Sequence, residues 1–457
     1  MTAETTLLIL GASGDLTSRL LLPALGQLLT REPQRRVHLQ GAGREEWDDE
    51  RWREVVRTSF AEGGADAANE VIASTSYRQA DITKPADLRA LIEGARGRLA
   101  LYFAVPPAVA ASACDALTHV PLPAGTVLAL EKPFGVDEAS ALRLNQTLER
   151  LVPEHQIFRV DHFLGRSTVL NLLGVRFANR VLEPVWSAEH VESVMIRFDE
   201  SLGLEGRAGY YDRAGALTDM IQSHLLQVLA FVAMEPPATL DEVDLRDATT
   251  AALRATALWD DAPRTASRRA RYTAGTIDGR TLPSYVDEQG VDPGRGTETL
   301  AEMTCEVRTA RWAGVPFTLR SGKALAEPDA EIVIRFRPVR HLPEGFTGAA
   351  DGSVLRFSLG PDRMSLELNV NGAEDPFSLE RTRLHAELGE GALRAYGEVL
   401  SGILDGDATL SVRGDAAVQC WRIVQPVLAA WQAGNVPLEE YPAGSTGPAS
   451  WDRPSPA

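Results

Sequence analysis

An apolar run near the start of the chain leads directly into a glycine-rich turn. Residues 5–10 (TTLLIL) are followed at once by Gly11-Ala-Ser-Gly14-Asp-Leu, and a helical pattern then runs over 18–29. A buried strand, a tight turn and a helix in succession begin a βαβ unit, in which backbone amides and the helix dipole bind a pyrophosphate. Gly11 permits the turn, and Gly14 permits close approach of a ligand to the backbone. The GxxG spacing also occurs in ordinary strand–helix turns, but its place after the first strand favours a dinucleotide site made by Gly11, Ser13, Gly14, Asp15 and Leu16.

Strands and helices alternate from residue 1 to about residue 160. Apolar strand candidates at 37–40, 99–104 and 127–130 are separated by helical stretches, among them 48–61 and 84–94. This alternation predicts a parallel, doubly wound sheet of the Rossmann-like kind. We therefore expect an α/β dinucleotide-binding domain over residues 1–160.

The rest of the chain has a different pattern. Its strand candidates alternate polar and apolar residues with period two, at 190–200, 330–336, 354–359 and 364–370. Such alternation predicts a mostly antiparallel sheet, covered by helices expected at 167–180, 211–232, 243–258, 389–403 and 416–433. We expect an α+β substrate-binding and oligomerisation domain over 161–457. It should contain a partly irregular excursion at 260–298 and a tail, 442–457, that is ordered only if it docks.

Composition and charge narrow the class of protein. A net charge of −17 repels nucleic acid and anionic membranes, so an anionic ligand needs a local cluster of positive groups. No apolar run reaches the ~18–20 residues of a membrane span, and Met1-Thr2-Ala3-Glu4 lacks the regions of a signal peptide. Cys114, Cys305 and Cys420 are scattered, which indicates core thiols and no metal site. We expect a cytoplasmic protein without nucleic-acid or membrane partners.

Informative residues follow several of the predicted strands, where open α/β sheets bind ligands. The second strand leads into Arg44-Glu45-Glu46. Arginine there suits the 2′-phosphate of NADP and an acidic residue suits the 2′-hydroxyl of NAD, so NADP is favoured and NAD stays possible. Ala104-Val-Pro106-Pro follows a later strand, where a rigid turn can flank the nicotinamide ribose. Lys132 follows the next one, and because the 46 basic residues include only three lysines, we place it between cofactor and substrate.

Two histidines have acidic neighbours. Asp161-His162 lies where the first predicted domain gives way to the second, and Asp219 and His224 lie on a predicted helix. A lone helical histidine is more often structural, but a carboxylate beside an imidazole is also the arrangement of a general base with its orienting group. Asp219 and His224 are five residues apart and do not share one face of an ideal α-helix. We expect both to line one pocket near a helix end.

Longer motifs make the chain recognisable. GASGDL, AVPP, EKPFG, RVDHFLG, EPVW, RAGYYDRAGALTDMIQSHLLQ and AGVPFTLRSGK are specific strings, and the chain resembles glucose-6-phosphate dehydrogenases from its first strand nearly to its C-terminus. The resemblance implies hydride transfer from C1 of glucose 6-phosphate to NADP, giving the 1,5-lactone without a metal. It also implies a homodimer or homotetramer.

The resemblance assigns expected roles to single residues. His224 resembles the base that removes the proton of the anomeric hydroxyl, and Asp161 resembles the carboxylate that orients this base. His162 matches a residue that binds the 6-phosphate. Further substrate contacts are expected from Glu200, Asp219, Lys132, Lys323 and, at the phosphate, Arg166.

Five positions depart from the family pattern around the sugar and its phosphate. Polar groups usual in the family are absent at Leu20, Phe163 and Pro328, Ser223 replaces an asparagine, and Arg166 replaces a lysine. Losing one donor to a charged group costs about 1.5–3 kcal/mol, unless Arg166 compensates by binding a phosphate or another oxyanion such as a sulfonate. Two alternatives stay open. One is the same reaction on a differently 6-substituted glucose, such as sulfoquinovose, with NAD or NADP. The other is a non-catalytic, cofactor-binding regulatory homologue.

Overall fold

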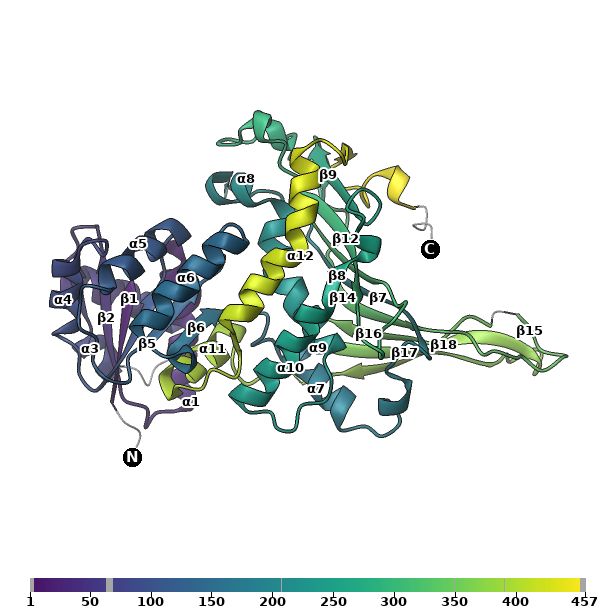
Figure 1. The fold of residues 1–457 in the computed structure, drawn as a ribbon, viewed down its shortest axis with the longest axis horizontal. Helices are drawn as coiled ribbons and strands as arrows, with labels where there is room; N and C mark the ends of the chain where they lie inside the picture. Colours follow the sequence, from purple (N-terminus) through teal and green to yellow (C-terminus); the bar gives the residue numbers. More distant parts are fainter. Residues whose placement is uncertain (1–3, 63–68, 207, 349, 390, 453–457) are drawn as a thin grey trace. The chain divides into compact units, whose positions relative to one another are not determined.

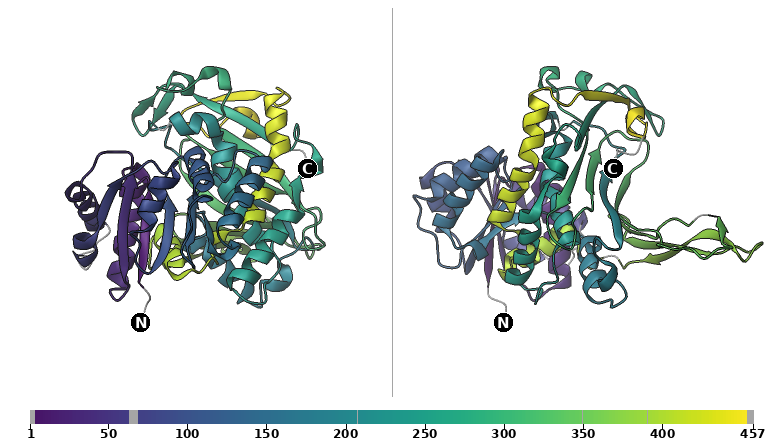
Figure 2. Two further views of the ribbon diagram at one scale, coloured as in Figure 1. Left: turned by 60° about the vertical axis from the view of Figure 1, so that its left-hand side comes forward. Right: turned by 45° about the vertical axis from the view of Figure 1, so that its right-hand side comes forward.

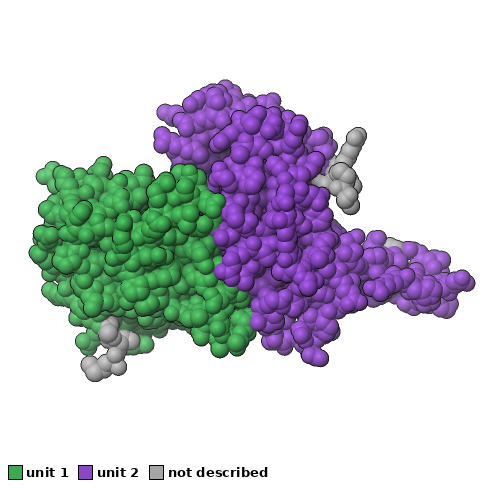
Figure 3. Space-filling model, viewed as in Figure 1, with its two compact units in different colours: residues 1–166, 237–250, 391–418 green, residues 167–236, 251–390, 419–457 purple. Residues whose placement is uncertain are grey.

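The polypeptide divides into two compact units (Figure 3). The computed structural model describes residues 4–62, 69–206, 208–348, 350–389 and 391–452. Unit 1 comprises residues 1–166, 237–250 and 391–418, and unit 2 comprises residues 167–236, 251–390 and 419–457. Unit 1 therefore contains two later segments that the sequence analysis had assigned to a domain over 161–457.

Unit 1 contains a seven-stranded sheet in the order β19-β6-β5-β4-β1-β2-β3 (Figure 1). Its parallel strands are β1 (Thr5–Leu10), β2 (Val37–Gly43), β3 (Ser76–Gln79), β4 (Arg98–Phe103), β5 (Val127–Glu131) and β6 (Ile157–Val160). The short strand β19 (Ser411–Val412) pairs antiparallel with β6 and forms one edge. This order is that of a doubly wound sheet and confirms the Rossmann-like prediction.

Helices cover both faces of this sheet. Leu7 and Ile9 of β1 belong to a core shared with helices α1 and α11, while Leu8 and Leu10 point the other way and are also buried. Strands covered on both faces need apolar residues at every position, which explains the continuous apolar run of β1. The helices are η1 (Thr17–Leu21), α1 (Leu22–Arg31), α2 (Asp49–Glu62), α3 (Asn69–Ser74), α4 (Pro85–Ile92), α5 (Pro107–Leu117), α6 (Glu138–Leu151), η3 (Glu154–Gln156) and α11 (Ala395–Asp405).

Unit 2 is built on an 11-stranded sheet in the order β15-β18-β17-β16-β14-β7-β13-β12-β9-β20, with β8 paired to β12. Its strands are β7 (Val191–Asp199), β8 (Thr256–Leu258), β9 (Ser267–Thr273), β12 (Leu300–Val307), β13 (Phe317–Gly322), β14 (Asp329–Phe336), β15 (Thr347–Gly348), β16 (Val354–Ser358), β17 (Arg363–Asn371), β18 (Ser378–Glu387) and β20 (Leu438–Pro442). Among the described residues, the named strands of this sheet that pair in parallel are β7–β13, β9–β20 and β15–β18. The predicted, mostly antiparallel sheet is confirmed, and β17 and β18 extend from it as a long ribbon (Figures 1 and 2).

Helices pack on this second sheet. The π-helix η5 (Leu217–Leu225) contacts β7, β12 and β13. The other helices are α7 (Ser167–Phe177), η4 (Glu183–Val185), α8 (Ala208–Ala216), α9 (Leu226–Ala233), η6 (Trp259–Asp261), η7 (Tyr285–Asp287), η8 (Pro293–Arg295) and η9 (Ala449–Asp452). A small hairpin joins β10 (Gly275–Ile277) to β11 (Arg280–Leu282). Helices α10 (Glu242–Ala255) and α12 (Gly414–Gln432) contain residues of both units.

One expectation about local structure was wrong, and the structure makes two others more specific. The helix predicted over 243–258 ends at Ala255, and its last three residues form β8 on the edge of β12. The excursion at 260–298 is partly irregular but contains β9. Its arginines hid the strand pattern, because they are charged residues whose guanidinium groups are bonded inside the protein: Arg268 to Glu302, Arg269 to the carbonyl of Val436 and Arg271 to Glu440. The tail docks as far as it is described: Trp451 is buried, and its indole N–H donates to Glu439 over 2.8 Å.

One helical run is apolar enough to resemble a membrane span. Among the described residues, Ala208–Ala233 has a window with a mean hydropathy of 1.3, and 83% of that window is buried inside the protein. Burial of this extent is what the core helix of a globular domain shows.

Candidate active site

The turn after β1 leaves no room for a side chain at its first glycine. Gly11 has a φ of 92°, and a Cβ there would lie 2.3 Å from the carbonyl oxygen of Ala104 and 2.6 Å from Cγ1 of Val105. The N–H of Gly11 donates to the carbonyl of Ala42 over 2.8 Å, which fixes the turn against β2. A tight turn of this kind, directly before a helix, fits a dinucleotide pyrophosphate.

The carboxyl ends of the parallel strands meet at one edge of the unit 1 sheet. Leu10 pairs with Phe103, Phe103 with Leu130, and Glu131 with Val160. The residues that follow these strands therefore lie along that edge, as open α/β sheets place their ligand-binding residues. The structure brings together there the predicted residues Gly11, Arg44, Ala104, Pro106, Lys132 and Asp161.

Asp161 is a buried carboxylate that follows β6. The N–H of Phe163 donates to its Oδ1 over 2.9 Å. Burial raises the pKa of Asp161 to about 6, although the neighbouring His162 and Lys132 favour its charged form. The buried position therefore favours the neutral form of this carboxyl more than water does.

Two departures from the family pattern are in direct contact with each other. The guanidinium of Arg166 lies over the ring of Phe163, 4.2 Å from the ring centroid. A cation at this distance from an aromatic face is attracted by its quadrupole. Phe163 lacks a hydroxyl, but its ring stabilises the positively charged guanidinium of Arg166 through a cation–π contact.

His162 is supported by an aromatic residue that sequence analysis missed. The rings of His162 and Tyr396 stack with centroids 5.3 Å apart and an interplanar angle of 16°. The Tyr396 hydroxyl donates to Oε2 of Glu131 over 3.4 Å, and the Tyr102 hydroxyl donates to Oε1 of the same carboxyl over 2.5 Å. Burial raises the pKa of Glu131 to about 7. Tyr396 comes from α11, and no local pattern connects it to the other three residues.

The helix that carries Asp219 and His224 is a π-helix. At its end the N–H of Leu226 donates to the carbonyl of Ile221, five residues earlier. Residues five apart are hydrogen-bonded neighbours on successive turns of a π-helix. The sequence analysis assumed an ideal α-helix, in which Asp219 and His224 lie on different faces, whereas in the π-helix they lie on neighbouring turns. His224 is almost fully buried, and the hydroxyl of Tyr210 donates to Asp219 over 3.3 Å.

Glu200 and Lys323 form an ion pair. They follow β7 and β13, which run parallel with Asp199 opposite Gly322. Nζ of Lys323 lies 2.7 Å from Oε2 of Glu200 and 5.3 Å from the centroid of the Tyr211 ring. The structure thus brings these two predicted substrate residues together within unit 2.

Glu298 was not predicted and contacts the start of the π-helix. It accepts a hydrogen bond from the N–H of Leu217 over 3.0 Å. Burial raises its pKa to about 7. The sequence gives little indication of this role, because a single acidic residue between two threonines is common in the segment before a strand.

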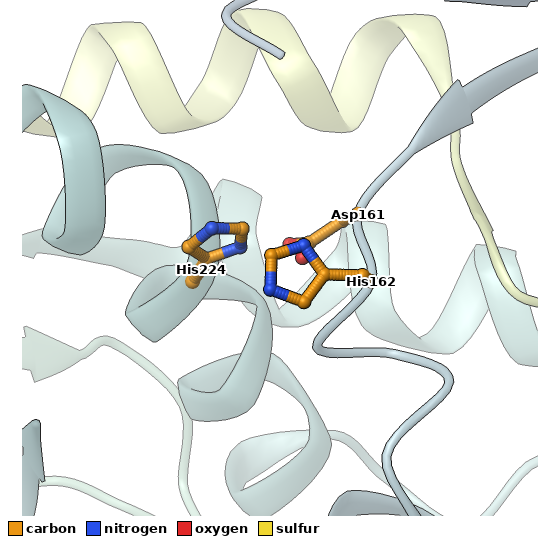
Figure 4. Close-up of side chains that lie close together, drawn as sticks. All are labelled: Asp161, His162 and His224. Carbon is orange, nitrogen blue, oxygen red and sulfur yellow. The ribbon is translucent and has the colours of Figure 1, made fainter. Parts of the chain in front are cut away.

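The two imidazoles come from different units. Figure 4 draws Asp161 and His162 on the segment after β6, and His224 on the helix η5. Asp161 and His162 belong to unit 1 and His224 belongs to unit 2. The pairing of Asp161 with His224, like every role assigned to a site residue, stays a prediction.

Comparisons with known proteins identify relatives of both parts of the chain. Residues 8–171 match the family model "Glucose-6-phosphate dehydrogenase, NAD binding domain", and residues 173–454 match "Glucose-6-phosphate dehydrogenase, C-terminal domain". Glucose-6-phosphate 1-dehydrogenase of Gluconobacter oxydans is 39% identical over 461 residues, which span 96% of this chain and 94% of that protein. The match extends over both units.

Solved structures agree with these matches. A glucose-6-phosphate dehydrogenase in complex with glucose 6-phosphate superposes with a TM-score of 0.87 at 28% identity, covering 99% of this chain and 97% of that one. Glucose-6-phosphate 1-dehydrogenase from Mycobacterium avium gives a TM-score of 0.85 at 31% identity, covering 98% and 96%. The family resemblance and the fold class drawn from the sequence are confirmed.

Proposed function

This chain belongs to the glucose-6-phosphate dehydrogenase family, and we propose that it oxidises C1 of glucose 6-phosphate with NADP to give the 1,5-lactone. The two-part match over residues 8–171 and 173–454 carries the proposal. Both the glycine turn and the sugar residues lie within it. Relatives of this name at near full length do not favour a sulfo-sugar or a non-catalytic role.

The cofactor would bind along the edge of the unit 1 sheet. NADP, when bound there, accepts the hydride that leaves C1. The turn formed by Gly11, Ser13, Gly14, Asp15 and Leu16 would hold the pyrophosphate. Arg44 would contact the 2′-phosphate, and Ala104 and Pro106 would flank the nicotinamide ribose. The closed geometry around Gly11 supports this assignment.

The protein's own task in the oxidation is to remove a proton. As the C1–H bond breaks with its electron pair, the anomeric O–H must lose its proton so that the oxygen pair completes the C=O bond. His224 would accept this proton, since a neutral imidazole is a base near working pH. Asp161 would orient the imidazole and stabilise the positive charge that it gains.

The predicted substrate residues would share the contacts with the sugar. Glu200 and Asp219 would accept hydrogen bonds from its hydroxyls, with Lys323 fixing the Glu200 carboxylate. His162 and Arg166 would bind the 6-phosphate, and Lys132 would lie between sugar and cofactor. The stacking of Tyr396 on His162 and the support of Phe163 under Arg166 favour a preformed anion site.

A matched sugar panel tests the function. NADPH formation is measured with glucose 6-phosphate, glucose and 6-deoxy-6-sulfoglucose. We expect kcat/KM for glucose 6-phosphate to exceed that for glucose by about a hundredfold or more, because two charge-assisted contacts are lost without the phosphate. Deuterium placed at C1 should appear on the reduced cofactor. A preference for the sulfo-sugar would support the alternative substrate, and no turnover of any sugar would contradict an enzymatic role.

The family resemblance also favours a homodimer or homotetramer located in the cytoplasm. Light scattering on the purified protein measures its mass against the 49.5 kDa of one chain. A monomer at micromolar concentration would contradict the oligomer.

A further inference from the structure

We propose that Glu45 is the residue that limits the preference for NADP, so that the chain binds NAD as well as NADP. The inference rests on the proposed function, since it concerns the cofactor of that reaction. It assigns to one carboxylate a selective role that opposes Arg44, its neighbour in sequence.

Glu45 lies beside the glycine turn. Leu10 pairs with Ala42, so the turn after β1 and the tip after β2 share one edge of the sheet. The hydroxyl of Ser13, within the turn, donates to Oε2 of Glu45 over 2.5 Å. The carboxylate is thereby tied to the loop that would hold the pyrophosphate.

Gly43 provides the room for this contact. A Cβ at position 43 would lie 2.6 Å from the hydroxyl of Tyr77, 3.0 Å from Oγ of Ser13 and 3.4 Å from Oε2 of Glu45. Tyr77 also donates to the carbonyl of Glu45 over 3.1 Å, which holds the backbone as well. Glu45 is therefore held by two hydrogen bonds, one from Ser13 to its carboxylate and one from Tyr77 to its backbone carbonyl.

The carboxylate is charged at neutral pH. The hydrogen bond from Ser13 lowers the pKa of Glu45 below its ordinary value. Arg44 cannot cancel this charge alone, since its side chain is 71% exposed and lies 4.0 Å from Asp81. Asp81 in turn lies 3.7 Å from Lys84. Two positive side chains, Arg44 and Lys84, and three negative ones, Glu45, Glu46 and Asp81, thus lie at or near the tip of β2. An arriving 2′-phosphate therefore meets no excess of positive charge.

The Glu45 carboxylate has opposite effects on the binding of NAD and of NADP. It accepts a hydrogen bond from the ribose 2′-hydroxyl of NAD, and it repels the doubly negative 2′-phosphate of NADP. Arg44 attracts the phosphate. Because Arg44 attracts the 2′-phosphate and Glu45 repels it, the chain binds both NADP and NAD.

Binding of cofactor fragments by the full chain tests the inference without turnover. Calorimetry compares 2′,5′-ADP with 5′-ADP on the wild type and on Glu45→Gln. We expect the substitution to raise the affinity for 2′,5′-ADP by about tenfold and to leave the affinity for 5′-ADP unchanged or lower. The gain in affinity for 2′,5′-ADP should decrease as the salt concentration rises. Glu46→Gln is the matched control: it removes the same charge one residue further on and should change the ratio far less.

The outcomes separate the two proposals. The role of Glu45 would be overturned if Glu45→Gln and Glu46→Gln raised the affinity for 2′,5′-ADP equally, or if neither raised it. A wild type that binds 2′,5′-ADP more than a thousandfold tighter than 5′-ADP would also overturn it. Failure to oxidise any sugar, with the fragment ratios as expected, would refute the proposed function and leave the cofactor selectivity standing.

Discussion

The carboxylate of Glu298 occupies the space that a side chain at Gly215 would need. A Cβ at Gly215 would lie 2.3 Å from Oε1 of Glu298, and Gly215 has φ 66° and ψ 174°. This backbone region is essentially limited to glycine. The break lets the chain start a new helix at Leu217, whose N–H donates a hydrogen bond to the same carboxylate. The placement of the helix that carries His224 therefore depends on one missing methyl group.

Gly215→Ala should destabilise the protein by at least about 2 kcal/mol, because it adds backbone strain and a clash with Glu298. Denaturant unfolding measures the change. Gly209→Ala, in the same helix α8, is the control, since no atom lies within 4 Å of its added Cβ. Equal stability of the two variants would contradict the packing of Glu298 against Gly215.

His224→Asn should lower kcat by about 10²–10⁴-fold, the range that a general base contributes. Binding of glucose 6-phosphate, followed by calorimetry, should be nearly unchanged. Ser223→Ala removes only a hydroxyl bonded to the Asp219 carbonyl and should retain most turnover. Near-normal kcat in His224→Asn would exclude this histidine as the base.

Phe163→Leu should raise KM for glucose 6-phosphate about two- to tenfold, because it removes the aromatic face beneath Arg166. The KM for unphosphorylated glucose should not move. A change of the same size for both sugars would mean that Phe163 supports the fold rather than the anion site.

Arg44→Ala should lower the affinity for NADP by about tenfold or more and leave the affinity for NAD nearly unchanged, since only NADP carries the 2′-phosphate. Cofactor titration by fluorescence measures both. Equal losses would show that Arg44 contacts a part common to the two cofactors.

Glu131→Gln should flatten the pH dependence of stability. Burial raises the pKa of Glu131 to about 7, above its ordinary value near 4.5, so the folded state holds the proton more tightly than the unfolded state. The stability that this proton provides is full below about pH 4.5 and falls as the pH rises towards 7, by about 2–3 kcal/mol. Tm is measured for both proteins from pH 5 to pH 8. Parallel curves would contradict a neutral Glu131 in the folded protein.

Local features of this chain could be predicted from sequence, and distant contacts could not. The strand β1 and its glycine turn are fixed by neighbouring residues, as are the periodic strands β14 and β16. The π-helix η5 was read as α-helical because the two helices require the same apolar residues. Strand β18 (SLERTRLHAE) was missed, since a ribbon exposed on both faces has no apolar alternation. Tyr396 and Glu298 reach the site only through tertiary packing.

Unit 1 is built from segments that lie far apart in the sequence, and this has a consequence for its biosynthesis. Strand β19 completes the sheet beside β6, α11 packs on α1, and Asn145 donates to the carbonyl of Gly414 over 2.7 Å. All three late partners belong to residues 391–418, which a ribosome makes only after most of unit 2. Until these residues are made, the nascent segment 1–166 has β6 as an open sheet edge and lacks the packing of α11 on α1. A chain released before residue 418 would lack part of both units.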